Sequence, residues 1–435
     1  MYVYQLNIIF LGEKRYTMWA LFKNSNFTKL FFGRVVTNIG DSMYAVAAMW
    51  LVYELSSSAF YTGLAGFLTR IPQTFQFLAG PLIDRWSLRR TLVVTQLLQF
   101  IFVLIIPIAY YAGMLTVTVV LVVMPLIATV EQFAYPAQTV ALPKIIKKEQ
   151  LVKGNTLFSF AYQGIDLAFY GVAGILVTMI GAVSIYLLDS ITFAIALLLF
   201  WSLHIPNDEK RIEKRSSGMK AIKNYGKDLL VGFRFVYHSI IRKFFIATVA
   251  ANFTFGVAFA VMPVYADFRG GSTTYGFLIA AFSGGFLIGA LLTTVFEHFP
   301  LGMTMIVTYL FSTIAWVSSV FIPSQWGSII VFGLAIVPLG ATQVLMAAAG
   351  QRMIPEDLLA RVFSVITSVS AASMPIGSLI GGIFGDLFGG PIIFALGSLG
   401  MLFVSLVWLI IPELRTIPKV DAIDPHKYGL ADKVS

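Results

Sequence analysis

The sequence of 435 residues is 58% hydrophobic and only 12% charged, which excludes an ordinary soluble protein, because soluble domains carry about twice that charged fraction. Its formal net charge of +9 does not indicate nucleic-acid binding, since Lys and Arg gather in short turns between long apolar runs, as they do in the cytoplasmic turns of membrane proteins. The sequence has no cysteine and only four scattered histidines, so disulfides, thiolate nucleophiles and zinc sites are excluded and no cofactor is expected.

The first 28 residues precede any run long enough to cross a bilayer. Among residues 1–17 the charges of Glu13, Lys14 and Arg15 follow the apolar part, whereas a signal peptide carries its charges first. We expect residues 1–28 to form an N-terminal cytoplasmic segment, with Met18 favoured as the true start over an extra interfacial segment.

Twelve mostly apolar runs of about 20 residues or more follow, and each is long enough for a transmembrane helix. They are predicted at 29–54, 59–83, 91–111, 115–139, 151–180, 183–205, 243–267, 274–296, 301–322, 326–350, 358–387 and 391–412. The first six predict an N-terminal six-helix bundle over 29–205, and the last six a C-terminal six-helix bundle over 243–412.

The short turn after the second run fixes the expected orientation. It contains Arg85, Arg89 and Arg90, and arginines so placed stay in the cytoplasm because carrying each through hydrocarbon costs about 3 kcal/mol. The other turns on that side also hold Lys144, Lys147, Lys148 and Arg352, whereas the opposite side holds only Arg269. We therefore expect a multi-pass protein of the cell membrane with both termini in the cytoplasm.

The longest interruption, residues 206–242, predicts a cytoplasmic linker. Apolar residues recur in it every three or four positions among many Lys and Arg, which is typical of an amphipathic helix on an anionic membrane surface. These are Ile222, Tyr225, Leu229, Phe233, Val236 and Ile240. The linker is interpreted as a surface helix that joins the two bundles, with docking of a partner as the alternative. The tail over 413–435 is polar and expected to be a mobile cytoplasmic segment.

The two halves repeat at an offset of 208 residues. This offset carries Leu151 onto Leu359, Gly174 onto Gly382 and Gly181 onto Gly389. A parallel repeat of six spans plus six is typical of transporters whose halves rock about a central site. The predicted fold class is an all-α membrane protein with twelve transmembrane helices in two pseudo-symmetric six-helix bundles.

Small residues mark faces for close helix packing. Gly377, Gly381, Gly385 and Gly389 recur every four positions along the eleventh span. Such a stripe lets another helix backbone approach closely.

Ionisable residues inside the spans fall in the first half. They are Arg34, Asp41, Arg70, Glu131, Asp166 and Asp189. Charges within a membrane are costly and usually face the bundle interior, where they mark a pathway or a relay. We interpret Asp41 or Asp166 as a proton-binding group for which Arg70 supplies a countercharge; the alternative is that Arg70 pairs with one of them structurally. Arg34 lies seven residues, or two helical turns, before Asp41 on the same helical face. It is also close enough to the cytoplasmic end to snorkel. Glu131 and Asp189 are weaker candidates for an inner and an outer gate.

Aromatic residues dominate the second half. The substrate-cavity candidates are Phe253, Phe259, Phe282 and Phe286. Opposite the carboxylates of the first half, they suit a bulky amphiphilic substrate, and a cationic one in particular.

The turn Gly80-Pro-Leu-Ile-Asp84-Arg85-Trp-Ser-Leu-Arg89-Arg90 resembles the loop signature of the major facilitator superfamily of secondary transporters, with Ser87 where the family usually has glycine. The resemblance covers Asn24 to about Leu414. Gly40-Asp41, Pro136 to Pro143 and Asp189 to Phe193 further resemble the branch that contains macrolide-efflux proteins and the enterobactin exporter.

This resemblance implies that Gly80, Asp84, Arg85 and Arg89 or Arg90 form a latch between the cytoplasmic faces of the two halves in the outward-open state. Proton antiporters of the superfamily often carry Gly-Pro in the fifth span, and Gly171-Val172-Ala173-Gly174 lacks that proline. The direction of transport therefore stays open at this point.

The functional hypothesis is a secondary active transporter that exports a hydrophobic or amphiphilic small molecule, such as a drug, macrolide-like compound or siderophore-like metabolite, in exchange for protons. Its expected partners are the small-molecule substrate, protons and the lipid bilayer, without nucleic acid, and the chain is expected to act as a monomer. The alternatives are an importer or lipid flippase of the same fold, or a membrane receptor or scaffold without transport. An enzyme is not expected, because the sequence contains no catalytic motif.

Overall fold

The computed structural model describes residues 18–75, 86–205, 230–231 and 233–424, and every regular element in these ranges is a helix. The first half contains the 3₁₀ helices η1 (Met18–Lys23) and η3 (Lys148–Gln150), and α2 (Ser25–Ser56), α3 (Ala59–Thr74), α5 (Leu88–Tyr111), α6 (Val117–Ile145), α7 (Leu151–Ile180) and α8 (Ala182–Trp201). The second contains α10 (Ile241–Arg269), α11 (Ser272–Leu291), α12 (Thr293–Phe296), α13 (Leu301–Phe321), α14 (Gln325–Met353), α15 (Glu356–Phe388), α16 (Gly390–Leu396), α17 (Leu399–Ile410), α18 (Pro412–Arg415) and η5 (Val420–Ala422).

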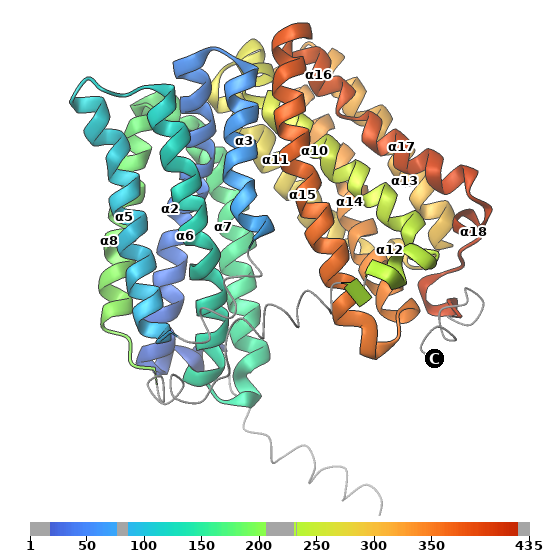
Figure 1. The fold of residues 1–435 in the computed structure, drawn as a ribbon, viewed down its shortest axis with the longest axis horizontal. Helices are drawn as coiled ribbons and strands as arrows, with labels where there is room; N and C mark the ends of the chain where they lie inside the picture. The colour runs from blue at the N-terminus through green and yellow to red at the C-terminus, as the bar shows by residue number, and fades with distance from the viewer. Residues whose placement is uncertain (1–17, 76–85, 206–229, 232, 425–435) are drawn as a thin grey trace, which may run out of the picture.

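Each of the twelve predicted spans overlaps a helix or a pair of helices: the eighth covers α11 and α12, and the last covers α16 and α17. Eleven spans within the described residues are long and apolar enough to cross a membrane, and α3, with 16 residues, stands in the place of the second predicted span. The structure therefore confirms an all-α membrane protein with two six-helix bundles. They stand side by side, blue to green and yellow to red (Figure 1).

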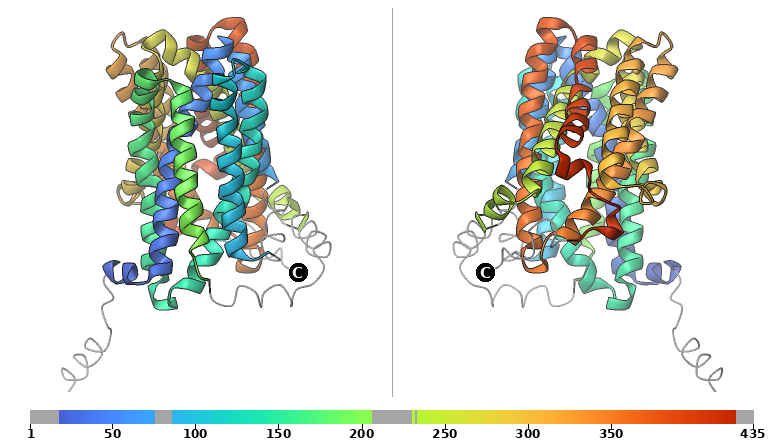
Figure 2. Two further views of the ribbon diagram at one scale, coloured as in Figure 1. Left: turned by 90° about the vertical axis from the view of Figure 1, so that its left-hand side faces the viewer. Right: turned by 90° about the vertical axis from the view of Figure 1, so that its right-hand side faces the viewer.

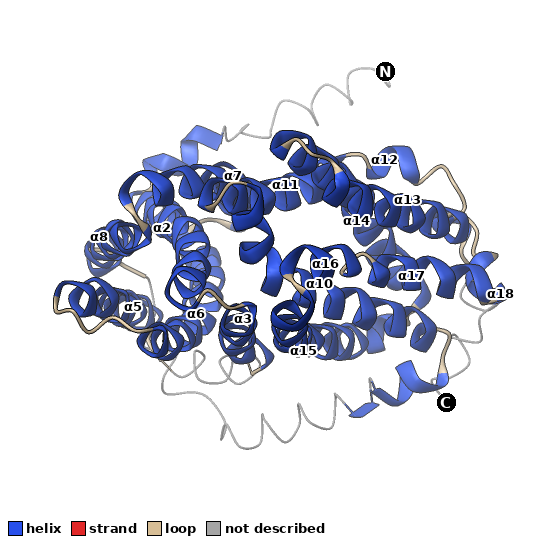
Figure 3. Cartoon of the chain, turned by 90° about the horizontal axis from the view of Figure 1, so that it is seen from above, coloured by secondary structure: helices blue, strands red, loops and turns tan. Residues whose placement is uncertain are grey.

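The two bundles use the same set of helix contacts. In the first, α2 packs on α7 and α8, α5 on α6 and α8, and α3 on α6; in the second, α10 packs on α15 and α16–α17, α13 on α14 and α17, and α11 on α14. Seen from above, the helices form two similar rings (Figure 3). This equivalence is what the sequence repeat predicts.

The repeat also holds for the turns. Gly181 ends α7 with a φ of 81°, and Gly389 ends α15 with a φ of 90°. Both adopt the left-handed region that side-chain-bearing residues avoid, so glycine at each end of the 208-residue offset serves the same backbone turn.

Because the helices alternate in direction, the ends of the molecule can be named. The linker end carries the start of α2, the end of α8 and the start of α10, and is the lower end in Figures 1 and 2. We call the opposite end, which carries the turns at 57–58, 181, 270–271 and 389, the closed end. The described chain starts and finishes toward the linker end, as an even number of crossings requires.

Several boundaries differ from those predicted. Helix α2 begins at Ser25 rather than at 29, because the Asn24 side chain accepts hydrogen bonds from the backbone of Asn26 and Phe27 and so caps it. Asn24 also donates to the carbonyl oxygen of Ile145 at 2.8 Å, and Leu21 is buried, which ties residues 18–24 to the first bundle. Helix α6 continues to Ile145 instead of ending at 139.

The prediction of a mobile tail is wrong for residues 413–424. Leu414, Ile417 and Ile423 are buried against the second bundle, and the backbone of Leu301 and Gly302 donates to the carbonyls of Pro418 and Ile417. Three apolar residues spaced along a polar segment supply this attachment. Of the predicted linker helix, only residues 230–231 and 233–240 are described; these are helical up to residue 238 with Val236 buried, and the remainder lies outside the described residues.

The glycine stripe of α15 packs closely against α10, as predicted. A Cβ at Gly381 would lie 2.6 Å from the Cα of Val257, and one at Gly377 would collide with the carbonyl of Phe253. On a neighbouring face, Gly382 meets α3, where its added Cβ would lie 2.9 Å from the Cα of Gly63. The equivalent pair joins α7 to α11: a Cβ at Gly174 would lie 2.9 Å from the Cα of Gly276. These two glycine pairs are where the bundles touch backbone to backbone.

We expect Gly174→Ala to destabilise the protein by about 1–3 kcal/mol, because the new methyl group overpacks the contact between α7 and α11. Gly164→Ala in the same helix is the matched control, since its added Cβ would meet only the Phe160 ring at ordinary distances of 3.5 Å and more. The free energy of unfolding, measured in mixed micelles, checks this. Equal losses for the two variants would contradict the role assigned to the glycine pair.

Candidate functional site

A cavity of about 1030 Å³ lies between the two bundles. It is lined by α2, α3, α6 and α7 from the first bundle and by α10, α11, α13, α14, α15 and α17 from the second. It runs from Tyr275, near the start of α11, to Phe244 and Trp408 toward the linker end. This volume is at the upper end of the range for small-molecule pockets, so a large drug-sized molecule fits.

At the closed end the bundles are joined by a carboxylate that caps a helix of the other bundle. Asp386, two residues before the end of α15, accepts hydrogen bonds from the Ser58 hydroxyl and the Ala59 backbone, both at 2.6 Å, and from the Phe60 backbone at 3.2 Å. These groups form the N-terminus of α3, where backbone N–H groups are unpaired and the helix dipole favours negative charge. Asp386 therefore holds α3 to α15.

The pseudo-equivalent junction uses neutral groups. Thr178 stands 208 residues before Asp386, and its hydroxyl lies 2.6 Å from that of Ser272 and 2.9 Å from that of Thr273 at the start of α11. Tyr53 adds a hydrogen bond to Asp267 at 2.9 Å. Thr62 also donates to the carbonyl of Ala260 at 2.6 Å. These hydrogen bonds hold the two bundles together in the half toward the closed end.

Inside the first bundle, Arg34 and Asp41 form an ion pair. The two side chains on α2 approach to 3.7 Å, consistent with their spacing of two helical turns, and both are largely buried. Arg34 also donates to Asn38 at 2.9 Å and stacks over the Tyr162 ring, 3.9 Å from its centroid. The countercharge of Asp41 is therefore Arg34, on the same face of α2, and not the predicted Arg70.

Asp166 on α7 is bound by polar residues of α2 rather than by Arg70. Its carboxylate accepts hydrogen bonds from Ser42 at 2.6 Å and Asn38 at 3.2 Å. Asn38 also binds Arg34, so one amide connects the carboxylate of α7 to the guanidinium of α2. Ser42 and Asn38 were not predicted; both are polar residues on the buried face of α2, one turn from Asp41 or less.

Glu131 on α6 faces the cavity and interacts electrostatically with Arg34 and Asp166. We call Arg34, Asp41, Glu131 and Asp166 the charge cluster: three carboxylates and one guanidinium. Asp189, on α8, does not line the cavity. Its side chain is fully buried against Gly40 of α2. It accepts a hydrogen bond from Thr192 at 3.1 Å, and its second oxygen has no hydrogen-bond partner in the described structure.

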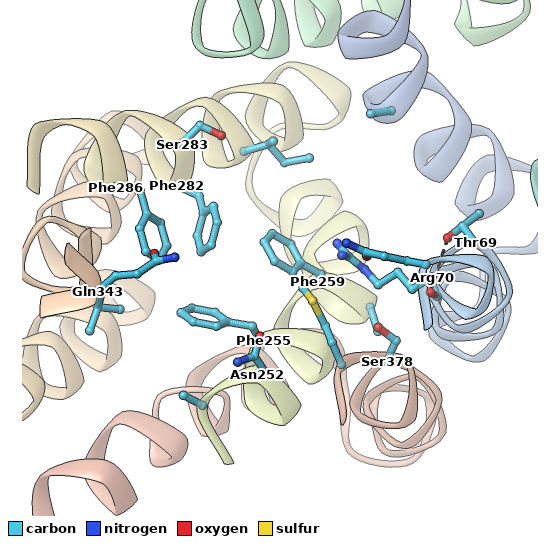
Figure 4. A pocket seen from close by; sticks show the side chains of 18 of the residues that line it. Thr69, Arg70, Asn252, Phe255, Phe259, Phe282, Ser283, Phe286, Gln343 and Ser378 are labelled. Atoms are coloured by element: carbon cyan, nitrogen blue, oxygen red, sulfur yellow. Dashed lines mark hydrogen bonds between the residues drawn. The ribbon is translucent and has the colours of Figure 1, made fainter. Parts of the chain in front are cut away.

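Arg70 points into the cavity from α3, toward the second bundle (Figure 4). Its guanidinium carbon lies 5.8 Å from the centroid of the Phe259 ring, and Tyr170 and Tyr275 line the cavity with it. No carboxylate among the described residues forms an ion pair with it. The proposed pairing of Arg70 with Asp41 or Asp166 is thus absent from this structure.

The second bundle faces the cavity with an aromatic wall of Phe255, Phe259, Phe282 and Phe286 (Figure 4). The ring centroids of Phe259 and Phe282 lie 4.9 Å apart, and those of Phe282 and Phe286 5.0 Å apart. Three of these were predicted. Phe253 does not line the cavity, because two residues along a helix from Phe255 its side chain points toward a different face, and its carbonyl packs on Gly377.

Comparison with known proteins agrees with this architecture. The model of the family described as "Transmembrane secretion effector" matches residues 16–429. The chain belongs to this family of the major facilitator superfamily.

The relatives of this transporter are distant but span nearly its whole length. It is 24% identical over 427 residues to macrolide efflux protein A of Streptococcus pyogenes, covering 93% of this chain and 99% of that one. It is 23% identical over 399 residues to the multidrug efflux pump Tap of Mycolicibacterium fortuitum, covering 89% and 96%. The solved structure of a bacterial homologue of the human lysosomal transporter Spinster, inward-facing and unoccupied, matches with a TM-score of 0.65 at 14% identity over 93% of this chain and 97% of that one.

The loop motif of the transporter is only partly described. Gly80, Asp84 and Arg85 lie outside the described residues. Arg89 donates from Nε to the carbonyl of Trp201 at 3.1 Å, at the end of α8 in its own bundle, and Arg90 is exposed. The latch that the resemblance implies therefore stays a prediction.

Sequence reasoning missed the neutral polar lining of the cavity. Thr69 and Ser378 lie beside Arg70, and Asn252 and Gln343 lie on the side of the aromatic wall (Figure 4). Asn252 and Gln343 have amide side chains within otherwise apolar spans. A polar residue isolated in such a span is the sequence signal that could have identified them as cavity residues.

The charge cluster predicts non-additive stability effects. Arg34→Gln is expected to destabilise the transporter by about 3 kcal/mol, because it leaves buried carboxylates without their cation. Adding Asp41→Asn to it should cost much less than Asp41→Asn costs alone, which gives a coupling energy of about 1–3 kcal/mol in a double-mutant cycle of unfolding. Arg70→Gln with Asp41→Asn is the control cycle and should be additive within about 0.5 kcal/mol. Additivity in both cycles would contradict the ion pair.

The closed end predicts a change in access. Because the sequence has no cysteine, Ser283→Cys places a single thiol in the cavity. Asp386→Ala should increase its labelling by a membrane-impermeant maleimide from outside intact cells several-fold, since α3 loses its cap from α15. Asp421→Ala, an exposed carboxylate paired with Arg352 toward the linker end, is the matched control and should leave labelling unchanged. Unchanged labelling in the Asp386 variant would show that this junction does not hold the end closed.

Proposed function

We propose that this transporter exports a hydrophobic or amphiphilic small molecule from the cytoplasm across the cell membrane by proton-coupled alternating access. The observation that carries the proposal is the large cavity between the bundles, which are joined by hydrogen bonds at one end, with the charge cluster beside it. A cavity of this kind supplies a central site, and rocking of the two bundles exposes it to one side at a time.

The orientation comes from charge. The linker end carries the basic turns, including Lys144, Lys147, Lys148 and Arg352, whereas Arg269 is the basic residue of the closed-end turns. The positive-inside rule puts the linker end in the cytoplasm. In that orientation an exporter loads its substrate through the linker end.

Proton coupling is supported by the composition of the charge cluster. Three carboxylates surround one guanidinium, so the fully ionised cluster has an excess of negative charge. Because like charges held close together repel, binding of a proton by one of the carboxylates is favoured. Glu131 faces the cavity and Asp41 lies behind it next to Arg34, which connects the cluster to the substrate space. Binding of substrate and of proton at adjacent sites provides the coupling that antiport needs.

The direction and breadth of transport are supported by the relatives, which are named as a macrolide efflux protein and a multidrug efflux pump. The aromatic wall and the large volume favour an amphiphile over a small polar solute. An importer or lipid flippase would use the same rocking bundles, and a receptor or scaffold would keep the cavity without turnover. We expect the monomer to be the functional unit.

Inverted membrane vesicles test the proposal directly. With an inward-acidic proton gradient, vesicles that contain the transporter should accumulate at least one amphiphilic probe of a panel with cationic, neutral and anionic members faster than vesicles without it, and an uncoupler should abolish the difference. The panel is Hoechst 33342, N-phenyl-1-naphthylamine and 1-anilinonaphthalene-8-sulfonate. Accumulation that ignores the gradient would eliminate proton coupling. No transport of any amphiphile in either direction would favour the receptor or scaffold.

Asp41→Asn should reduce gradient-driven uptake at least tenfold while leaving the protein folded in the membrane, because the cluster loses a titratable carboxylate next to Arg34. Asp421→Asn, exposed near the linker end, is the matched control and should transport like the wild type. Wild-type rates for Asp41→Asn would remove this residue from the relay.

A further inference from the structure

Arg70 is a charge within a membrane-spanning helix that has no acidic partner among the described residues. The other arginines that enter the bundles are compensated: Arg34 pairs with Asp41 at 3.7 Å, and Arg269 donates to the carbonyl of Ile322 at 2.7 Å. Intramembrane arginines usually pair or bind backbone carbonyls, because an isolated charge there is costly. Arg70 instead faces the Phe259 ring and the cavity, which Tyr170 and Tyr275 line with it.

The surroundings of Arg70 suit an anion that comes from outside the protein. Thr69, Tyr170, Tyr275 and Ser378 line the cavity with it. The hydroxyls of Thr69 and Ser378 donate to the carbonyls of Ala65 and Gly256, whereas the phenol groups of Tyr170 and Tyr275 can donate hydrogen bonds to a bound anion. Glu131 also faces the cavity, and the cation that acts on it is Arg34 of the charge cluster rather than Arg70. A guanidinium with free donors in a site that is partly shielded from water binds a carboxylate, sulfonate or phosphate group strongly, and often with two parallel hydrogen bonds.

The apolar part of the ligand has a place beside this charge. Phe259 touches both features: its ring lies 5.8 Å from the Arg70 guanidinium carbon and 4.9 Å from the Phe282 ring. Phe282 and Phe286 continue the aromatic wall away from Arg70 (Figure 4). An anionic head on Arg70 thus leaves a hydrophobic body lying along the phenylalanines.

We propose that the substrate of this cavity is an anionic amphiphile, whose acidic group is bound by Arg70 and whose aromatic or aliphatic body packs on Phe259, Phe282 and Phe286. This proposal deepens the proposed export function and rests on it only in calling the ligand a substrate. Binding of the ligand does not depend on turnover. It replaces the cationic preference suggested by the sequence, because Asp41 is paired with Arg34 and Asp166 accepts hydrogen bonds from Asn38 and Ser42.

Two fluorescent probes that differ by one acidic group test the proposal. 1-Anilinonaphthalene-8-sulfonate and N-phenyl-1-naphthylamine share the same aromatic body, and only the first carries a sulfonate. The purified full-length transporter is placed in phosphatidylcholine nanodiscs, and each probe is titrated against the wild type, Arg70→Gln, Arg70→Lys, Phe282→Ala and Arg242→Gln. Arg242 is exposed near the start of α10 and is not among the residues that line the cavity, so it serves as the matched control.

The wild type should bind the sulfonate probe saturably and more tightly than the neutral one. Arg70→Gln should weaken the sulfonate probe at least tenfold and leave the neutral probe within about twofold, in line with the loss of a hydrogen-bonded charge. Arg70→Lys should be intermediate because it keeps the charge without the planar donors. Phe282→Ala should weaken both probes, and Arg242→Gln neither.

Equal affinity of the wild type and Arg70→Gln for the sulfonate probe, or parallel loss of both probes, would overturn the proposal, as would absence of saturable sulfonate binding. None of these outcomes bears on whether the protein transports, which the vesicle assay decides separately. Phosphatidylglycerol in the nanodiscs distinguishes two sources of the anion: competition that depends on Arg70 identifies a lipid headgroup, and lack of competition identifies a free small molecule. Either result supports the anionic site.

Discussion

The structure depends on two places where the bundles touch backbone to backbone. Gly63 meets Gly382 between α3 and α15, and Gly174 meets Gly276 between α7 and α11. In a bilayer, lipid tails are as apolar as leucine, so helices associate through close packing and hydrogen bonds rather than through exclusion of water. The absence of side chains at these four positions allows that packing. It also brings Asp386 to the start of α3 and Thr178 to the start of α11, where hydrogen bonds complete the junctions.

Because both contacts lie toward one end, the rest of the interface is free to enclose a cavity. Its two walls differ chemically: the first bundle contributes the charge cluster and Arg70, and the second contributes phenylalanines and neutral amides. Keeping the costly charges in one bundle lets them compensate one another within a rigid unit, so rocking need not break the Arg34–Asp41 pair. Arg70 is the exception, since it extends across the cavity toward Phe259 of the other bundle.

Much of this fold is predictable from the sequence, and the reasons are physical. A bilayer requires about 20 apolar residues per helix, so the spans can be counted, and a duplicated gene leaves Gly181 and Gly389 in the same turn of each half. It is harder to predict which charged side chains pair with one another. Arg34 and Asp41 lie on one helix and their pairing follows from helical spacing, whereas the partners of Asp166 are on another helix and depend on packing. The same holds for Phe253 and Phe255, where a rotation of about 200° decides which ring reaches the cavity.

The two junctions at the closed end show how a duplicated fold became asymmetric. At positions related by the 208-residue repeat, Thr178 offers a hydroxyl and Asp386 a carboxylate to the start of a facing helix. A carboxylate gains from the helix dipole and from charge-assisted hydrogen bonds to two backbone N–H groups, whereas the hydroxyl exchanges neutral hydrogen bonds that water replaces at little cost. The junction of α3 with α15 is therefore the stronger of the two. Arg70 lies on α3, so the helix that presents this charge to the cavity is also the one held by the stronger junction. A ligand bound to Arg70 would therefore contact the same helix that Asp386 holds at its N-terminus.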